Sequence, residues 1–167
     1  MSTVPGMRHS TGRPLLMQVL ATDDSVMQAL LRFTLAAVLL PHGTQHLLGW
    51  FGGYGFTGTL GWMSGTVGIP APLAAAAIVF EFVGPLALAI GLGGRVVGLG
   101  LVTFMATAAS THLQNGFFMN WFGTLRAGTE GFEYHILAIA LAAALAARGS
   151  GAYSIDRALT MGQRRNA

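Results

Sequence analysis

Four long apolar stretches constrain the fold of this chain more than any other feature of its sequence. They cover roughly residues 26–48, 72–92, 95–113 and 132–148, and polar or glycine-rich segments separate them. An α-helix needs about 20 apolar residues to cross a hydrocarbon layer of about 30 Å, because each residue adds about 1.5 Å. The sequence therefore predicts an all-α integral membrane protein, with four transmembrane helices that pack as an antiparallel four-helix bundle.

The composition supports this class and excludes several others. Hydrophobic residues make up 53% of the 167 residues and charged residues only 9%, which is too apolar for a soluble domain of this size. With no cysteine, the chain itself has no disulfide, no dithiol redox centre and no thiolate metal site, so a bound group or a partner must carry any electrons. We expect contact with membrane lipid and no nucleic-acid surface.

The sequence divides into three parts. We predict a cytoplasmic N-terminal tail at residues 1–24, without the residue order of a cleavable signal peptide, and a four-transmembrane-helix domain at 25–149. A cytoplasmic C-terminal tail at 150–167 contains a short interfacial helix. Residues typical of helix boundaries flank the apolar stretches: Ser25 and Gln28, Pro70 and Pro72, Gly93 and Gly94, and Gly149.

The arginines predict the orientation of the helices. All nine basic residues are Arg, and only Arg126 falls in the outer loops predicted at 49–71 and 114–131. The other eight lie at the opposite side: Arg8, Arg13, Arg32, Arg95, Arg148, Arg157, Arg164 and Arg165. Because basic residues favour the cytoplasmic side, we expect both termini in the cytoplasm and a multi-pass protein of the inner membrane.

Glu81 is the polar residue that the second apolar stretch contains. Counted from Pro72 at the helical rise, its carboxyl lies about 13 Å deep, near the middle of the membrane. A carboxylate there is costly and by default indicates a functional site that faces protein or water. Pro85 lacks an N–H and so leaves the carbonyl of Glu81 without its helical partner.

Further polar residues lie at the outer ends of the other helices. His42, Gln45 and His46 share one face of the first helix, next to a kink expected at Pro41. These residues and Glu81 suggest a pocket near the outer leaflet.

The third and fourth helices contribute a second group of candidates. His112 closes the third helix, and Glu133, Tyr134 and His135 open the fourth. Glu133 and His135 are about 200° apart around a helix, so at most one of them points at a common centre. The aromatic side chains Trp50, Phe51 and Phe117 of the outer loops could stack on a flat ligand, although an interfacial aromatic belt is the more common role of such residues.

Metal and haem sites are weaker interpretations of the same histidines. His42 and His46 have the spacing of zinc ligands, but no Glu lies between them as in HExxH, and we predict no metal site. Haem b would need one of these histidines opposite His112 or His135 at similar depth.

Five motifs in order resemble the DoxX family of small bacterial and archaeal membrane proteins. They are His42–Gly53 (HGTQHLLGWFGG), Glu81–Gly84 (EFVG), His112–Phe118 (HLQNGFF), Glu133–Tyr134 (EY) and Gly151–Arg157 (GAYSIDR). The resemblance covers about residues 26–160. It implies a four-helix bundle associated with membrane redox complexes, since relatives include a quinone-reducing thiosulfate oxidoreductase subunit and partners of thiol or superoxide defence enzymes. Where relatives usually carry Lys, this chain has the titratable His46.

These observations favour a membrane redox subunit with a pocket for a quinone or a similar small molecule. In this hypothesis Glu81 and His42 act in proton transfer, and the candidates that bind the ligand are Gln45, His46, Trp50, Phe51, His112, Phe117, Glu133 and Tyr134. Electrons would come from a membrane or extracytoplasmic redox partner, and an oligomer is compatible with the sequence. The alternatives are a non-catalytic anchor or assembly subunit, a haem-binding subunit, and a small proton-coupled carrier.

The arginine asymmetry generates a topology prediction. A reporter that is active only outside the cytoplasm should be silent when fused after Ala167 and active when inserted near Gly58. The reverse pattern of activity would place the cluster of His and Glu residues on the cytoplasmic side and contradict a pocket near the outer leaflet.

Overall fold

The computed structural model describes residues 14–124 and 129–164, and every regular element within them is helical. The α-helices are α1 (Leu15–Val19), α2 (Val26–Leu48), α3 (Gly55–Gly65), α4 (Ala71–Ile90), α5 (Gly94–His112), α6 (Glu133–Arg148) and α7 (Ile155–Arg164). Two short 3₁₀ turns, η1 (Trp50–Gly52) and η2 (Leu113–Asn115), follow α2 and α5. The all-α prediction is therefore correct for the part of the chain that is described.

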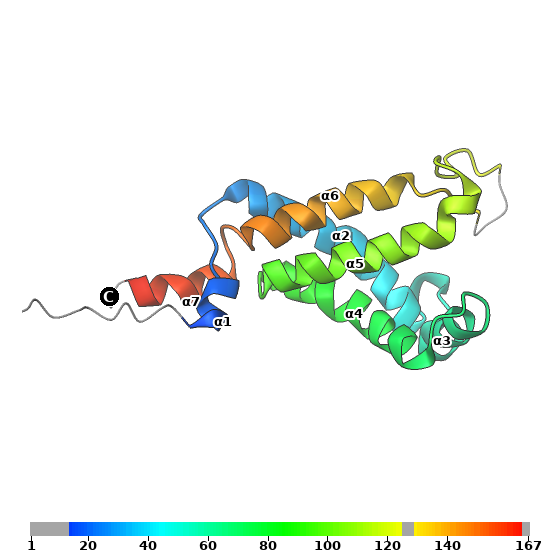
Figure 1. The fold of residues 1–167 in the computed structure, drawn as a ribbon, viewed down its shortest axis with the longest axis horizontal. Coiled ribbons are helices and arrows are strands. Elements are labelled where there is room, and N and C mark those ends of the chain that lie inside the picture. The colour runs from blue at the N-terminus through cyan, green and yellow to red at the C-terminus, as the bar shows by residue number, and fades with distance from the viewer. Residues whose placement is uncertain (1–13, 125–128, 165–167) are drawn as a thin grey trace, which may run out of the picture.

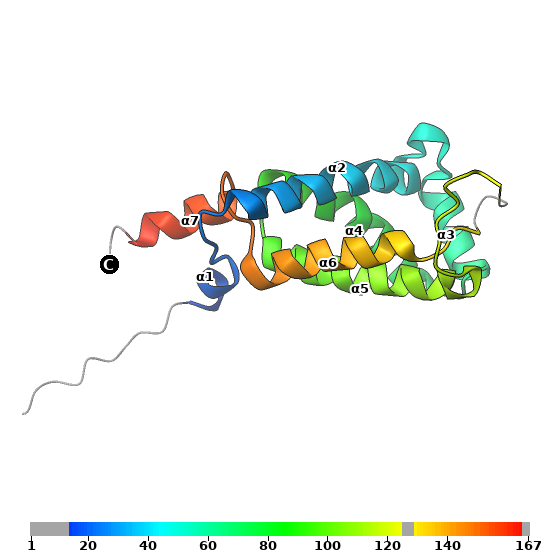
Figure 2. The same ribbon diagram turned by 90° about the horizontal axis from the view of Figure 1, so that it is seen from above.

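The long helices lie side by side along one axis. Helix α2 packs mainly against α4 and α5 packs mainly against α6, while contacts between α2 and α6 and between α4 and α5 join the two pairs (Figures 1 and 2). Helices α1 and α7 lie at one end of this assembly, and α3 and the loop before α6 lie at the other (Figure 1). The assembly therefore has a terminal end, defined by α1 and α7, and a loop end, defined by α3.

Three of the helices are long and apolar enough to cross a membrane, where the sequence predicted four. They are α2, α4 and the continuous helical segment Gly94–Asn115 formed by α5 and η2. Helix α6 has 16 residues, which corresponds to about 24 Å at the helical rise. It begins one residue later than predicted and is shorter than an ordinary membrane span.

Local signals set the helix ends close to the predicted positions. The Oγ of Ser25 accepts a hydrogen bond from the backbone N–H of Gln28 at 3.3 Å, as expected of a helix N-cap. Helix α4 ends at Gly91, whose φ of 70° lies in the left-handed region that glycine adopts without strain. The tight turn that follows leads directly into α5 at Gly94.

Glycine allows α5 to pack closely against α6. A Cβ on Gly98 would lie 2.7 Å from the backbone N of Ala146 and 2.8 Å from the carbonyl oxygen of Ala142. Real Cβ atoms do not approach backbone atoms so closely, so only glycine permits this separation of the two helices. The contact is of the kind that small residues make between membrane helices.

The segment between α2 and α4, predicted as an outer loop, contains the helix α3. Met63 of α3 packs with Ala74 and Ile78 of α4 in a small apolar cluster separate from the main core. This cluster covers the first turns of α4 at the loop end.

At the terminal end, the side chain of Arg32 is completely buried and makes five hydrogen bonds. Its Nη1 donates to the carbonyls of Leu88 and Ala89 at 2.7 Å each, in the last turn of α4. Its Nε and Nη2 donate to three carbonyls of the segment after α6, those of Ser150, Ala152 and Tyr153. A guanidinium has five N–H groups, so these five bonds use its full donor capacity. The positive charge also lies where the α4 dipole is negative.

Asp156 completes this buried network from the first turn of α7. Its two carboxylate oxygens accept hydrogen bonds from the backbone N–H groups of Gly93 and Gly94, at 2.8 and 3.0 Å, at the start of α5. The Oγ of Ser150 donates to the same carboxylate at 2.6 Å. The segment that closes the sequence motifs, Gly151–Arg157, therefore joins the ends of α4, α5 and α6.

Several arginines used in the orientation argument cannot be examined in this structure. Arg8, Arg13, Arg126 and Arg165 lie outside the described residues. The cytoplasmic position of the termini stays a prediction, although α1 and α7 do lie at the same end of the molecule (Figure 1).

The Arg32 network generates a stability prediction. Arg32→Met should lower the midpoint of thermal unfolding in detergent strongly, with a loss of at least about 3 kcal/mol, because it leaves five carbonyls without donors next to buried Asp156. Arg148→Met is the matched control, since the side chain of Arg148 is 66% exposed and makes only a 3.8 Å contact with Asp23. Equal unfolding midpoints for the two variants would show that the buried bonds do not stabilise the fold.

Candidate functional site

The centre of the candidate site is a direct contact between Glu81 of α4 and His46 of α2. The Oε2 of Glu81 lies 2.5 Å from the Nδ1 of His46. The side chain of Glu81 is 6% exposed, whereas that of His46 is 33% exposed. At this distance one proton must lie between the two atoms, because two unprotonated acceptors would repel each other. The imidazole therefore connects a buried carboxyl group to the surface of the protein.

A glycine allows the two helices to meet at this contact. A Cβ on Gly43 of α2 would lie only 2.7 Å from the Cα of Phe82 and would also collide with the carbonyl oxygen of Glu81. This is the carbonyl that Pro85 leaves without a helical N–H partner, so α2 covers a backbone group that α4 cannot satisfy itself. Gly43, Glu81 and Pro85 are all buried.

Glu81 and its partner His46 occupy different positions along their own helices. Glu81 lies at the middle of α4, but its partner His46 lies in the last turn of α2. The reason is that α4 extends past the end of α2 and packs there against α3. The middle of α4 therefore lies beside the last turn of α2, at the part of α2 that is nearest to the loop end.

Two buried polar atoms on α6 have no hydrogen-bond partner among the residues that the structure describes. They are the hydroxyl of Tyr134 and the Nδ1 of His135. Tyr134 interacts electrostatically with Glu81, and its ring lies 5.8 Å from that of His135. Buried polar atoms are nearly always paired with protein or water, so this region has a capacity for polar ligand atoms that the protein does not use itself.

The structure distributes the remaining predicted site residues over the loop end. Gln45 donates its side-chain N–H to the carbonyl of Phe51 at 3.3 Å and thereby holds η1 against α2. Trp50 and Phe51 are 58% and 72% exposed, and their rings meet edge to face on the outer surface. These three residues form a cap at the end of α2, and the stacking of Trp50 or Phe51 on a ligand stays a prediction.

A second group organises the loop before α6. The Oε2 of Glu133 accepts hydrogen bonds from the backbone N–H of Met119 and from the indole N–H of Trp121. Phe117 packs edge to face with Phe132, at a centroid distance of 5.6 Å. Glu133 thus serves the loop while His135 faces the interior, in agreement with the prediction that the two residues point in different directions.

The four membrane-region histidines separate into different environments. His42 is exposed on the side of α2, one turn before His46. His112 contacts the carbonyl of Glu130 through its Nδ1 at 2.7 Å, and its ring lies 5.0 Å from that of His135 with an interplanar angle of 35°. This close pair joins α5 to α6, whereas the haem alternative pairs one of these two histidines with His42 or His46 of α2 and stays a prediction. Among the residues that the structure describes, no three His, Asp or Glu side chains gather as a metal site.

The arrangement can hold and move a proton. A carboxyl that shares a proton with an imidazole can release it to a ligand or take it from the surface, and the exchange needs no large movement. Tyr134 adds a hydroxyl that can donate a hydrogen bond to an acceptor near Glu81.

Sequence reasoning did not find the part that Gly43 plays in the site. Only the side chains of residues 42–46 were considered there. The feature that could have indicated a close helix contact is Gly43, a small residue two positions after Pro41 on the face that carries His46. Sequence reasoning also assigned Arg32 to membrane topology only, whereas its side chain is buried.

A comparison with models of known protein families identifies the family of this chain. The model of the DoxX family matches residues 27–121, which is more than half of the chain, and the protein belongs to the DoxX family. It is accordingly a membrane protein. The match covers α2, α4 and α5, and with them Glu81 and His46. No curated protein and no solved structure matches the sequence.

The close contact at Gly43 generates a prediction about the site. Gly43→Ala should separate α2 from α4 and weaken the bond between His46 and Glu81, which lowers the unfolding midpoint. Gly61→Ala on α3 is the control, because a Cβ there meets nothing within 4 Å and alanine favours helix by up to about 1 kcal/mol. If Gly43→Ala raises the unfolding midpoint as Gly61→Ala should, the helices do not depend on this glycine.

Proposed function

We propose that this protein is a membrane redox subunit that binds a quinone-type molecule near the loop end and exchanges protons with it through Glu81 and His46. Reduction of a quinone to a quinol consumes two electrons and two protons, and oxidation of the quinol releases them. The ligand therefore needs hydrogen-bond donors at its oxygens and a group that transfers protons.

The direct bond between buried Glu81 and half-buried His46 is the observation that carries this proposal. An ionisable pair inside an apolar span is costly. By default such a pair indicates a proton or substrate pathway. The hydroxyl of Tyr134, which is buried and has no hydrogen-bond partner among the described residues, offers a donor to a quinone oxygen. In this proposal His46 replaces His42 as the proton-transfer partner of Glu81, since His46 makes the contact.

The proposal includes four membrane crossings in the inner membrane, with α6 as the fourth. An odd number of crossings would leave α1 and α7 on opposite sides of a membrane, but both lie at the terminal end (Figure 1). A 24 Å helix covers most of a hydrocarbon layer of about 30 Å, and the residues that flank α6 can complete the span. We place the terminal end in the cytoplasm on the basis of the arginines.

The chain has no cysteine to carry electrons itself, and in this proposal a redox partner supplies them. The aromatic residues exposed at the loop end are suited to contact with such a partner or with the membrane interface. They include Trp50, Phe51, Tyr54, Trp62, Phe118, Trp121 and Phe122.

A non-catalytic anchor or assembly subunit is the second candidate function. It is favoured by the same exposed aromatic surface and by the fact that His46 satisfies Glu81 within the protein. In that case the pair serves the packing of α2 on α4, and substitution of either residue should affect stability more than ligand binding.

The test is quinone binding by the purified protein in nanodiscs, with a short-chain ubiquinone as the probe and quenching of tryptophan fluorescence as the signal. We expect saturable binding that Glu81→Gln and His46→Gln each weaken by about tenfold, which corresponds to about 1.4 kcal/mol. His42→Gln is the matched control on the same helix, and it should change the affinity little because His42 is exposed. The infrared band of the Glu81 carboxyl group should disappear in Glu81→Gln.

Two results would contradict the redox proposal. One is the absence of saturable quinone binding by the unsubstituted protein. The other is unchanged binding in Glu81→Gln and His46→Gln with a lower unfolding midpoint, which is the outcome expected of an anchor subunit. If His42→Gln weakens binding and His46→Gln does not, the original choice of His42 from the sequence is the better one.

A further inference from the structure

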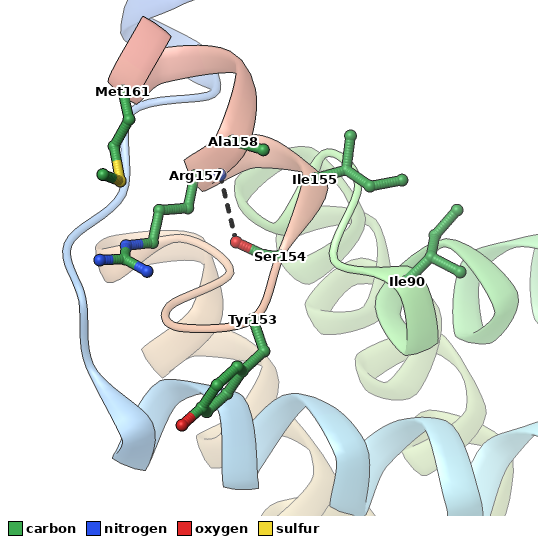
Figure 3. A pocket seen from close by; sticks show the side chains of 7 residues that line it. All are labelled: Ile90, Tyr153, Ser154, Ile155, Arg157, Ala158 and Met161. Atoms are coloured by element: carbon green, nitrogen blue, oxygen red, sulfur yellow. Dashed lines mark hydrogen bonds between the residues drawn. The ribbon is translucent and has the colours of Figure 1, made fainter. Parts of the chain in front are cut away.

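A shallow depression of about 430 Å³ lies at the terminal end, far along the molecule from Glu81. Its lining comes from the end of α4, from the segment before α7 and from α7 itself: Ile90, Tyr153, Ser154, Ile155, Arg157, Ala158 and Met161 (Figure 3). Four of these residues belong to the motif Gly151–Arg157, and none of them belongs to the proposed quinone site.

The apolar part of the depression continues the outer face of α4. Val79, Val83, Leu86 and Ile90 follow one another at helical spacing, and each side chain is at least 40% exposed. Ile90 is the last residue of α4, one of the helices long enough to cross a membrane. The exposed face of a membrane span contacts lipid chains, so the depression begins where such a chain would meet its headgroup.

The polar part of the depression lies beyond Ile90. Arg157 is half-buried and bonds through its Nη2 to the carboxylate of Asp24 at 2.5 Å. Its backbone N–H donates to the Oγ of Ser154, which fixes the first turn of α7 (Figure 3). Tyr153 has a φ of 53° and a side chain that is 78% exposed, so the backbone turns this ring away from the core. An amphipathic tyrosine beside an arginine is typical of the membrane interface.

The side chains described at the terminal end carry one net positive charge. Four arginines, Arg32, Arg95, Arg148 and Arg157, lie there with three carboxylates, Asp23, Asp24 and Asp156. Asp156 is buried against the start of α5, and Asp23 lies against Arg148, so Asp24 is the acidic group that bonds the arginine of the depression.

From this arrangement we infer that the depression is a binding site for one anionic phospholipid, whose phosphate meets Arg157 and whose acyl chain lies on Ile90 and the outer face of α4. Tyr153 provides a hydroxyl group at the level of the headgroup, whereas the hydroxyl of Ser154 donates to the carbonyl of Gly151 at 2.6 Å and fixes the turn before α7. The guanidinium can bind phosphate while it keeps the contact with Asp24, because its donors form a fork. The same site holds α7 at the membrane surface by its first turn.

Lipid is favoured over a protein partner or a second copy of this chain because the depression continues a surface that faces the membrane. Its apolar rim joins the exposed face of α4, and its polar rim lies beyond Ile90 at the end of that face. The rim combines one basic group with apolar side chains, and this is the pattern that recognises a headgroup and its chain together.

The experiment is native mass spectrometry of the full chain extracted in detergent, with phosphatidylglycerol or phosphatidylcholine added at equal concentrations. We expect one molecule of phosphatidylglycerol to be retained, with an occupancy about fivefold above that of phosphatidylcholine. Arg157→Gln should abolish this preference, and Ile90→Ser should lower the retention of both lipids. Arg148→Gln is the matched control, because Arg148 is an exposed arginine at the same end that does not line the depression.

Each other outcome overturns the inference. Equal retention of the two lipids, or a preference that survives in Arg157→Gln, shows that the depression does not recognise an anionic headgroup. Release of the lipid by inorganic phosphate alone shows an ion site that needs no acyl chain. A dimer that Ile90→Ser disrupts shows a second copy as the occupant. Circular dichroism of Arg157→Gln and Ile90→Ser confirms that both variants fold, and quinone binding is measured separately because it does not depend on this site.

Discussion

The packing of α2 on α4 is the interaction on which the rest of the structure depends. Two unusual contacts hold it, one near each end of the interface. At the terminal end the guanidinium of Arg32 satisfies the last carbonyls of α4, and at the loop end Gly43 lets α2 approach the carbonyl that Pro85 leaves free. Arg32 donates hydrogen bonds to carbonyls that have no partner within α4, and α2 at Gly43 shields another such carbonyl, that of Glu81. In an apolar environment such groups are costly, so they determine where the two helices meet.

The bond between Glu81 and His46 follows from this packing. A separation of α2 and α4 by one additional methyl group would move the imidazole away from the carboxyl, because the two side chains reach each other only at the close contact beside Gly43. The site that we propose for proton exchange is therefore a product of backbone geometry as much as of the two ionisable residues. Its half-exposed imidazole gives a buried carboxyl group access to the surface.

The arginines at the terminal end illustrate how one residue type can serve topology and structure together. Arg95 donates to the carbonyls of Ala21, Ala146 and Ala147, so it caps the end of α6 while Arg32 caps the end of α4. A cation at a helix C-terminus is favoured by the helix dipole. Part of the charge asymmetry that predicts orientation thus has a second physical cause in helix capping. Arg148, by contrast, has a side chain that is 66% exposed.

The sequence by itself determined the helices, because apolar length, capping residues and glycine or proline breaks act locally. It predicted α2, α4, α5 and α6 to within two residues at each end, and it singled out Glu81 and the face that carries His46, which the structure brings into contact. Only the tertiary structure decided which histidine meets Glu81, that Arg32 is buried, and that Gln45, Glu133 and Phe117 hold the loop end together. These outcomes depend on the offset between neighbouring helices, and this offset follows from close contacts at Gly43 and Gly98 that link residues far apart in the chain.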